Sequence, residues 1–542
     1  MKYEYAELGE NERQYDGIDL TKNRVVEAVY VRSPLSCDHG NAYIECLPAA
    51  RTREEVHDTY HRPILDYSWE QRKWPDFDRM KAIMQLRDVR FVLPFHMALE
   101  QEFGLALLNS YRHRNIHETY GALVTISDQK SNANYSSEKK LGAAINAGVA
   151  LLGYSGCGKT SAIGTLLSNY PQVVIHHDED GNQYTQIVYL YVVCVANSNF
   201  KALYQSVGRA IDRALGNTTP VYETVINQRK SIGEKTNKIC DLIDLFGIGA
   251  IIFDEVQLMD FDGTHENSFS SLMNIVNNTQ VALILVGTEE AYSKMLPKLQ
   301  IARRAGARIA ASKYCSSKDT FTLLCEQLFR YQWFDTHVEF TDDDVDTLYR
   351  LTYGIVDQLV SLYIYMHIYY VRSESKPTVN SDYISYISKK FFPGMQILLE
   401  QLKTGSISES DFERKSKEIR SDADRKLEIE MEDLRVQQAT MQIAQDVQDK
   451  QSRNYDQLLR NVVQNIRNTI QFTGEEYSDD EIVKDVNRIL RLKKNLSADE
   501  KQITQQTYQL LKRKPSETKP KGKRAVMDDV HIHMRNFLEQ SG

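Results

Sequence analysis

Residues 153–160, Gly-Tyr-Ser-Gly-Cys-Gly-Lys-Thr, decide the fold. They satisfy the pattern GxxxxGK[ST] and lie between an apolar run at 148–152 and a helical stretch at 161–167. A strand, a glycine-rich turn and a helix in this order let successive backbone N–H groups wrap a phosphate at the helix N-terminus. We expect Lys159 to reach the β and γ phosphates of ATP and Thr160 to offer its hydroxyl to Mg²⁺. The other residues expected to line the nucleotide are Gly153, Ser155, Gly156, Cys157, Gly158 and Ser161.

A second element comes about a hundred residues later, where residues 250–255 read Ala-Ile-Ile-Phe-Asp-Glu. An apolar strand that ends in two carboxylates places them at the carboxyl edge of a parallel sheet, next to a phosphate loop. This position predicts that Asp254 holds Mg²⁺ through water and that Glu255 polarises the attacking water as a general base. The alternative is a strand that ends in acids without a catalytic role. The preceding phosphate loop favours the catalytic interpretation.

A third apolar strand, residues 281–286, is followed by Gly287 and Thr288. Its place in the chain predicts that Thr288 contacts the γ-phosphate or the attacking water. Arg303 and Arg304 follow in the run Ala-Arg-Arg-Ala-Gly-Ala-Arg, which ends at Arg308. An arginine pair there could be a solvated helix face, but it also fits a finger that stabilises transition-state charge on a neighbouring subunit's nucleotide.

The apolar runs at 148–152, 187–196, 249–253 and 281–286 alternate with longer amphipathic stretches, which predicts an α/β fold with a parallel sheet. We expect five regions: an N-terminal domain at 1–125, the sheet domain at 126–312, a helical lid at 313–400, a long charged helix at 401–472 and a C-terminal region at 473–542. Residues 409–435 carry only a thin apolar stripe, which indicates an extended helix, either packed along one seam or simply solvated. Residues 512–524 are basic and predict a disordered linker before an amphipathic stretch at 526–538.

The composition is that of a globular protein: 542 residues, 42% hydrophobic and 26% charged, with a net charge of −8. These values exclude a wholly disordered, collagen-like or membrane-embedded chain. The longest apolar run has ten residues, no secretory signal is visible, and seven sparse cysteines suit a reducing compartment. We therefore expect a cytoplasmic protein without a membrane partner. Cys37, His39 and Cys46 lack the second ligand pair that would make a zinc site the better interpretation.

The phosphate loop, the Asp-Glu strand, the Gly-Thr strand, the arginine pair and the helical lid, in this order, resemble an AAA+ ATPase. In detail the chain resembles the TnsC family, the ATPase regulators of Tn-seven-like transposons. The similarity lies in the run 153–173, the run 188–216, Phe-Asp-Glu-Val-Gln at 253–257, Ala-Arg-Arg-Ala-Gly-Ala at 302–307 and residues 354–363. It covers about residues 145–375, and residues 526–542 are similar to the end of the longer family members. The N-terminal 120 residues match weakly.

The resemblance implies an ATP-dependent regulator that assembles as a ring or helical filament on double-stranded target DNA and is dismantled by hydrolysis. It also implies partners: a target selector of the TnsD or TniQ type, and transposase and endonuclease subunits of the TnsB and TnsA type, which bind the C-terminal tail. By family position, DNA contacts fall on Asn197, Asn199 and Lys201, with Arg229 and Lys230 as a second set. The chain departs from many AAA+ proteins at Asp357, where an arginine usually follows the lid glycine.

Three other interpretations remain open: a signalling or defence ATPase of the STAND type, a helicase loader, and a non-catalytic scaffold. The N-terminal segment shows no nuclease or protease constellation and no repeat array follows the lid, which disfavours the first. The long C-terminal extension disfavours a helicase loader, and Glu255 with the arginine pair disfavours a scaffold. Without the basic run at 512–524, the remaining residues carry a net charge of −14. The acidic balance therefore predicts that a single subunit binds DNA poorly.

Overall fold

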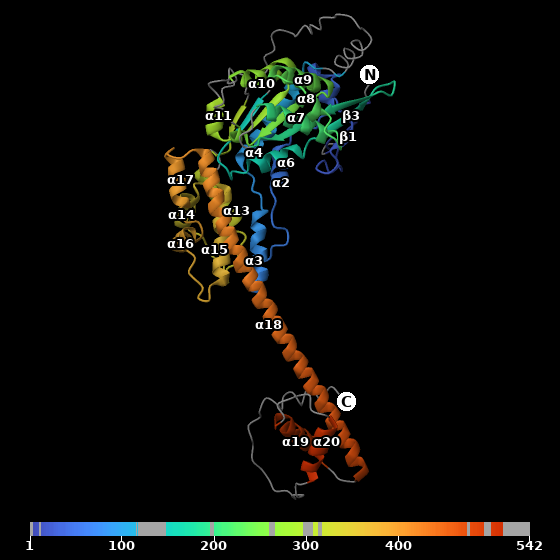
Figure 1. The fold of residues 1–542 in the computed structure, drawn as a ribbon, viewed down its shortest axis with the longest axis vertical. Helices are drawn as coiled ribbons and strands as arrows, with labels where there is room; N and C mark the ends of the chain where they lie inside the picture. Colours follow the sequence, from blue (N-terminus) through green and yellow to red (C-terminus); the bar gives the residue numbers. More distant parts are fainter. Residues whose placement is uncertain are drawn as a thin grey trace, which may run out of the picture. The chain divides into compact units, whose positions relative to one another are not determined.

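The computed structural model describes residues 4–9, 12–114, 116, 148–195, 200–259, 266–295, 307–312, 317–473, 477–492 and 500–512. The chain divides into two compact units, residues 1–432 and 433–542. Figure 1 shows the ribbon with its element labels. Within the described ranges, no helix combines the length and apolarity that a bilayer crossing needs.

The first unit is built on a five-stranded parallel sheet in the order β5-β6-β7-β2-β8. Its strands are β2 (Gly148–Leu152), β5 (Tyr189–Val193), β6 (Ala250–Asp254), β7 (Ala282–Gly287) and β8 (Ala307–Ala310). The predicted parallel sheet is confirmed. The strand predicted at 187–196 is shorter in the structure, where β5 covers Tyr189–Val193. Ile187 is instead the last residue of a separate strand, β4 (Gln183–Ile187), which pairs antiparallel with β3 (Val173–His177).

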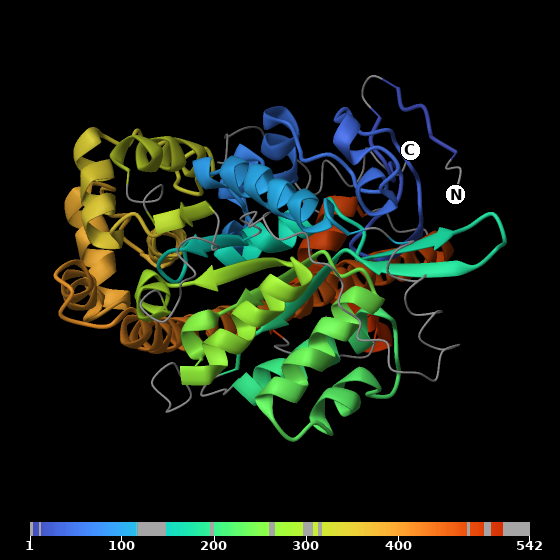
Figure 2. The ribbon, with the colours of Figure 1, turned by 90° about the horizontal axis from the view of Figure 1, so that it is seen from above.

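Both faces of this sheet are buried, as its continuous apolar strands require. Alternate residues of β6 show the two faces: Ala250 and Ile252 belong to one hydrophobic cluster, whereas Ile251 and Phe253 belong to another. The first face is covered by α4 (Pro94–Tyr111) and α6 (Lys159–Leu167), and the second by α7 (Phe200–Ala214), α9 (Ile232–Leu245) and α10 (Glu266–Thr279). Figure 2 shows α4 in light blue and the green helices on opposite sides of the strands.

The N-terminal residues share the core of the sheet domain. β1 (Val25–Glu27) pairs in parallel with β3 (Val173–His177), which pairs with β4 in a second, three-stranded sheet. The hydroxyl of Tyr111 in α4 donates to the carbonyl of Gly247 at 2.8 Å. The boundary expected near residue 125 therefore does not separate two compact units. The short elements of this segment are η1 (Ser36–Asp38), α1 (Ala42–Glu45), α2 (Arg53–Tyr60), η2 (Trp69–Lys73), α3 (Asp76–Met84) and η3 (Gln85–Arg87).

A helical region follows the sheet, over the range predicted for the lid. It comprises α13 (Lys318–Leu328), α14 (Asp342–Thr352), α15 (Val356–Arg372), α16 (Ser381–Phe391) and α17 (Met395–Lys403). The N-terminal segment also packs here. Arg79 of α3 pairs with Asp335 at 3.2 Å, and the indole N–H of Trp333 donates to Gln71 at 3.0 Å. The lid is thus held by residues far from it in the sequence.

The long helix expected from residue 409 is α18 (Glu409–Thr473), which has 65 residues. Phe412 and Leu427 of the predicted thin stripe are buried in the first unit. In the second unit the C-terminal part of α18 packs with α19 (Asp479–Leu492) and α20 (Glu500–Lys512), through Val462, Ile466, Val486 and Ile503. The predicted linker beyond Lys512 and the amphipathic tail lie outside the described residues.

Candidate nucleotide-binding site

The loop between β2 and α6 has the conformation that phosphate binding requires. Gly156 and Gly158 have φ angles of +88° and +84°, in the left-handed region that favours glycine. A Cβ on Gly156 would also come within 3.0 Å of Asp357. Gly158 is the N-cap of α6, so the helix N-terminus opens onto the loop. The backbone is therefore shaped to turn N–H groups towards an anion.

Lys159 begins α6 and folds back over its own loop. Its Nζ donates to the carbonyl oxygens of Gly153 at 2.7 Å and Tyr154 at 2.9 Å, and the side chain is buried. This places the ammonium group over the loop on which the phosphates of a nucleotide would lie. The arrangement agrees with the predicted phosphate-binding role of Lys159.

Thr160 and Asp254 meet across the end of the sheet. The Thr160 hydroxyl donates to Asp254 Oδ2 at 3.0 Å, and the Tyr191 hydroxyl donates to the same oxygen at 2.6 Å. Asp254 is 1% exposed, and its Oδ1 accepts the Glu255 N–H at 2.8 Å. A carboxylate and a hydroxyl are hard oxygen ligands, so this pair fits Mg²⁺ bound with water and substrate phosphates. Sequence reasoning missed Tyr191, because a tyrosine in an apolar strand gives no signal of its own.

Glu255 lies in a strained backbone conformation, with a φ of +57°. Its carboxylate accepts from Gln257 Nε2, which also donates to Glu413 of α18 at 3.3 Å. Burial raises the pKa of the Glu255 carboxyl, and the carboxylates of Glu413 and Asp254 raise it further, while Lys159 and Lys417 oppose the rise. A buried carboxyl whose pKa is raised is a candidate for general-base chemistry.

Thr288 follows β7, the strand beside β2. The two strand ends are joined where the Gly153 N–H donates to the Gly287 carbonyl at 3.1 Å. Thr288 is 1% exposed, and its hydroxyl accepts from the Ala291 N–H at 3.2 Å and interacts with the carboxyl of Glu409. Burial raises the pKa of Glu409, and the carboxylates of Glu289 and Glu290 add to that rise. The structure therefore places Thr288 at the same sheet edge as the loop and the two acids.

The remaining predicted site residues divide into three groups. Ser161 lies in the first turn of α6 and accepts from Arg90 Nε at 3.2 Å, and Cys157 is buried. Arg303, Arg304, Asn197 and Asn199 lie outside the described residues, so their roles stay predictions. Lys201 in α7 and the pair Arg229 and Lys230, which follow α8 (Tyr222–Asn227), are exposed.

The exposed cations gather near the C-terminal end of α8. Lys235 donates to the carbonyls of Ile226 at 2.7 Å and Asn227 at 3.3 Å, which are the last residues of α8. Burial lowers the pKa of Lys235, and the positive charge of Lys201 lowers it further, so these two side chains are close. Arg229 and Lys230 continue the chain from α8. Glu234 is exposed beside them and accepts the Lys230 N–H at 3.0 Å, so both signs of charge lie at this end of the sheet domain.

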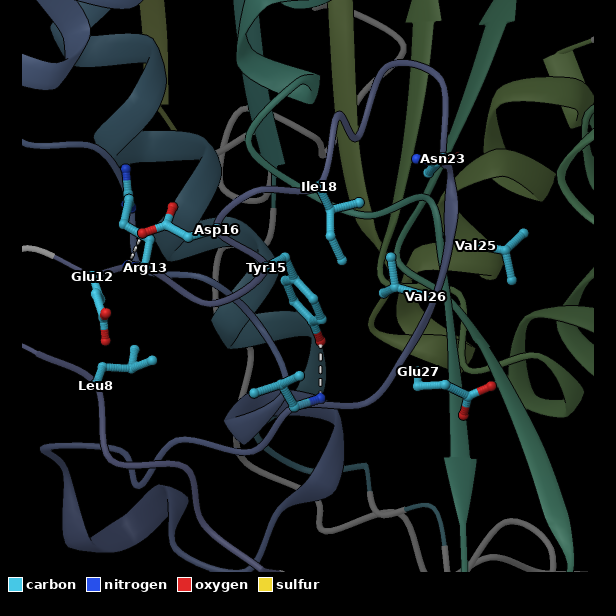
Figure 3. A pocket seen from close by; sticks show the side chains of 11 residues that line it. Leu8, Glu12, Arg13, Tyr15, Asp16, Ile18, Asn23, Val25, Val26 and Glu27 are labelled. Atoms are coloured by element: carbon cyan, nitrogen blue, oxygen red, sulfur yellow. Dashed lines mark hydrogen bonds between the residues drawn. The ribbon is translucent and has the colours of Figure 1, made fainter.

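Two hollows among the described residues are candidates for a ligand site. One, of about 330 Å³, is lined by Gly156, Gly158, Ser161, Asp357 and Arg420 among others. The other is an open N-terminal groove, lined by Leu8, Glu12, Arg13, Tyr15, Asp16, Ile18, Asn23, Val25, Val26, Glu27 and Val29. Figure 3 shows that some of its polar groups are already paired: the Arg13 N–H donates to Asp16 at 2.7 Å, and the Val29 N–H donates to the Tyr15 hydroxyl at 3.4 Å. The hollow at the phosphate loop is the candidate site, because the loop glycines and the N-terminus of α6 line it.

Residues 147–295 match the family model described as an AAA domain. Together with the strand order and the phosphate loop, this match confirms the predicted fold class, α/β with an AAA+ core. A search of curated proteins finds no match.

Solved structures with detectable similarity include the following three proteins. The ORC1 protein of Aeropyrum pernix in complex with DNA is 15% identical, with 47% of this chain and 62% of that chain covered and a TM-score of 0.30. The ORC2 protein of Aeropyrum pernix is 11% identical, with 50% of this chain and 73% of that chain covered and a TM-score of 0.28. NtrX of Brucella abortus is 12% identical, with 60% of this chain and 75% of that chain covered and a TM-score of 0.27. The match thus spans less than two thirds of the ORC1 chain.

Proposed function

We propose that this chain is an AAA+ ATPase that regulates DNA transposition in the manner of TnsC. It binds ATP with Mg²⁺, oligomerises on double-stranded target DNA, and links a target-selector protein to the transposase and endonuclease subunits. Hydrolysis then promotes disassembly. The observation that carries the ATPase part is the convergence of Thr160, Asp254 and Glu255 at the phosphate loop. The sequence resemblance supports the transposition part.

The residues of the site supply the steps of hydrolysis. Lys159 and the loop N–H groups bind the phosphates, and Thr160 with Asp254 would hold Mg²⁺. When bound, Mg²⁺ neutralises charge on the β and γ phosphates. Ionised Glu255 accepts the proton of the attacking water, and Thr288 contacts the water or the γ-phosphate. An arginine from a neighbouring subunit, Arg303 or Arg304, would complete the site, which makes hydrolysis weak in an isolated subunit.

Electron microscopy of the full chain with duplex DNA tests the proposal. Samples without nucleotide, with ATP and with a slowly hydrolysed ATP analogue are compared. We expect rings or filaments only where DNA and a triphosphate are both present. Closed, wheel-shaped oligomers that form without DNA would instead support a STAND-type signalling or defence ATPase. ATPase activity together with helicase loading, but without rings or filaments on DNA, would support the helicase-loader alternative.

A further inference from the structure

Asp357, the acid that follows the lid glycine, contacts an arginine from another helix. Arg420, in the fourth turn of α18, forms an ion pair with the Asp357 carboxylate. Asp357 begins α15, and its N–H donates to the carbonyl of Gly156 in the phosphate loop at 3.2 Å. Arg420 is therefore separated from the loop by a single residue.

The guanidinium of Arg420 lines the same hollow as the phosphate loop. Gly156, Gly158, Asp357 and Arg420 all contribute to its wall. Arg420 is 27% exposed, and its Nε is buried without a hydrogen-bond partner among the described residues. A guanidinium has five donors in a fixed fork that matches phosphate oxygens. The ion pair with Asp357 leaves donors of that fork available.

The direction of α18 adds a second geometric argument. Glu413 contacts Gln257 beside the candidate base, and Arg420 contacts Asp357 beside the loop. Seven residues of helix span about 10 Å at about 1.5 Å per residue. The first turns of α18 therefore run from the hydrolytic end of the site to the phosphate loop, with Arg420 at the loop end.

We propose that Arg420 is a nucleotide-binding residue, which reaches the phosphates of ATP from α18 and exchanges its ion pair with Asp357 for them. The proposal rests on the proposed ATPase function and names a residue of that same site. Asp357 then competes with the phosphates for the guanidinium. If the ion pair only joined α18 to the lid, substituting Arg420 or Asp357 would change the ATP affinity equally. The proposal instead predicts that the two substitutions change the ATP affinity in opposite directions.

ATP titrations of the full-length protein with Mg²⁺ test this difference. We expect Arg420→Ala to weaken ATP binding about tenfold, since a hydrogen bond to a charged group is worth about 1.5–3 kcal/mol and 1.4 kcal/mol is tenfold. Arg420→Lys should recover part of the loss. Asp357→Asn should bind ATP more tightly than the wild type, because it removes a competing negative charge. Arg425→Ala, at an exposed arginine of α18 paired with Asp422, is the matched control.

Two results would overturn the proposal: an Arg420→Ala protein that binds ATP like the wild type, or equal weakening by Arg420→Ala and Asp357→Asn. If the wild type itself binds no ATP, the proposed ATPase function fails instead. Thermal unfolding identifies a variant that does not fold. If Arg420→Ala does not fold, the ATP affinity of Arg420→Gln, which keeps most of the side chain's packing, is compared with that of Asp357→Asn.

Discussion

Lys159 donates to two carbonyls of its own loop, so its ammonium group lies over that loop. We predict that Lys159→Ala weakens ATP binding by about 30- to 100-fold, because a charged hydrogen bond of about 2–3 kcal/mol is lost. Assembly on DNA should be lost with it. Calorimetric titration measures the affinity, with Lys22→Ala at an exposed lysine as the control. Unchanged affinity in Lys159→Ala would contradict the role.

Glu255 tests the chemistry separately from binding. Its amide counterpart keeps the shape and the bond from Gln257 but cannot accept a proton. We predict that Glu255→Gln lowers the ATPase rate by about 10²- to 10⁴-fold, the usual contribution of a general base, while ATP still binds. Protein–DNA assemblies should then persist with ATP. Glu418→Gln, at an exposed acid of α18, should hydrolyse ATP normally; normal hydrolysis by Glu255→Gln would refute the assigned base.

At the scale of elements, α18 sets the charge around the base. The charged groups that interact with Glu255 include Asp254, Lys159, Glu413 and Lys417. Because Glu413 helps to raise the pKa of Glu255, and the base acts only when ionised, the rate should fall as the pH drops through that raised pKa. We predict that Glu413→Gln moves this acid limb to lower pH. A pH profile of the ATPase rate measures it, with Glu418→Gln as control; an unmoved limb, or one at higher pH, would contradict the coupling.

Local patterns were enough to predict the elements that carry the phosphate loop, the two acids and Thr288. Residues 250–255 are apolar until the two acids, so strand and site are both visible in one short run. β8 escaped prediction because its four residues, Ala-Arg-Ile-Ala, have too little apolar length to indicate a strand. The packing of the N-terminal segment on the sheet domain was not predicted, because Tyr111 and Gly247, which are in contact, are 136 residues apart in the sequence.

The α18 contacts show the same limit at the site itself. Gln257 and Glu413 are 156 residues apart, and Arg420 and Asp357 are 63 apart. The charged run at 409–435 predicts a helix, but charges spaced along a helix indicate neither which face packs nor against what. Only the folded chain brings Glu413 to the base and Arg420 to the lid. The sequence therefore indicates the candidate residues on the sheet edge, but not the contacts that α18 makes with them.

At the scale of the whole molecule, the distribution of charge matters more than its sum. The net charge of −8 should keep single subunits off DNA, while Lys201, Arg229 and Lys230 are exposed on the sheet domain. An oligomer repeats such a set in every subunit, so its phosphate contacts add along the duplex. DNA binding should therefore depend on ATP-driven assembly, and it should weaken steeply with salt.

The salt dependence gives a quantitative test of these three cations. The slope of log K against log salt changes by about 0.9 for each phosphate contact on duplex DNA. We predict that changing Lys201, Arg229 and Lys230 together to Ala makes the slope shallower by about 2.7 per subunit bound, while ATP affinity without DNA is unchanged. Fluorescence anisotropy with labelled duplex measures the slope in the presence of a slowly hydrolysed ATP analogue. The control triple, Lys22→Ala, Lys73→Ala and Lys318→Ala, removes the same charge from exposed positions elsewhere. An equal change in both triples would mean that net charge alone, and no contact surface at α8, governs the binding.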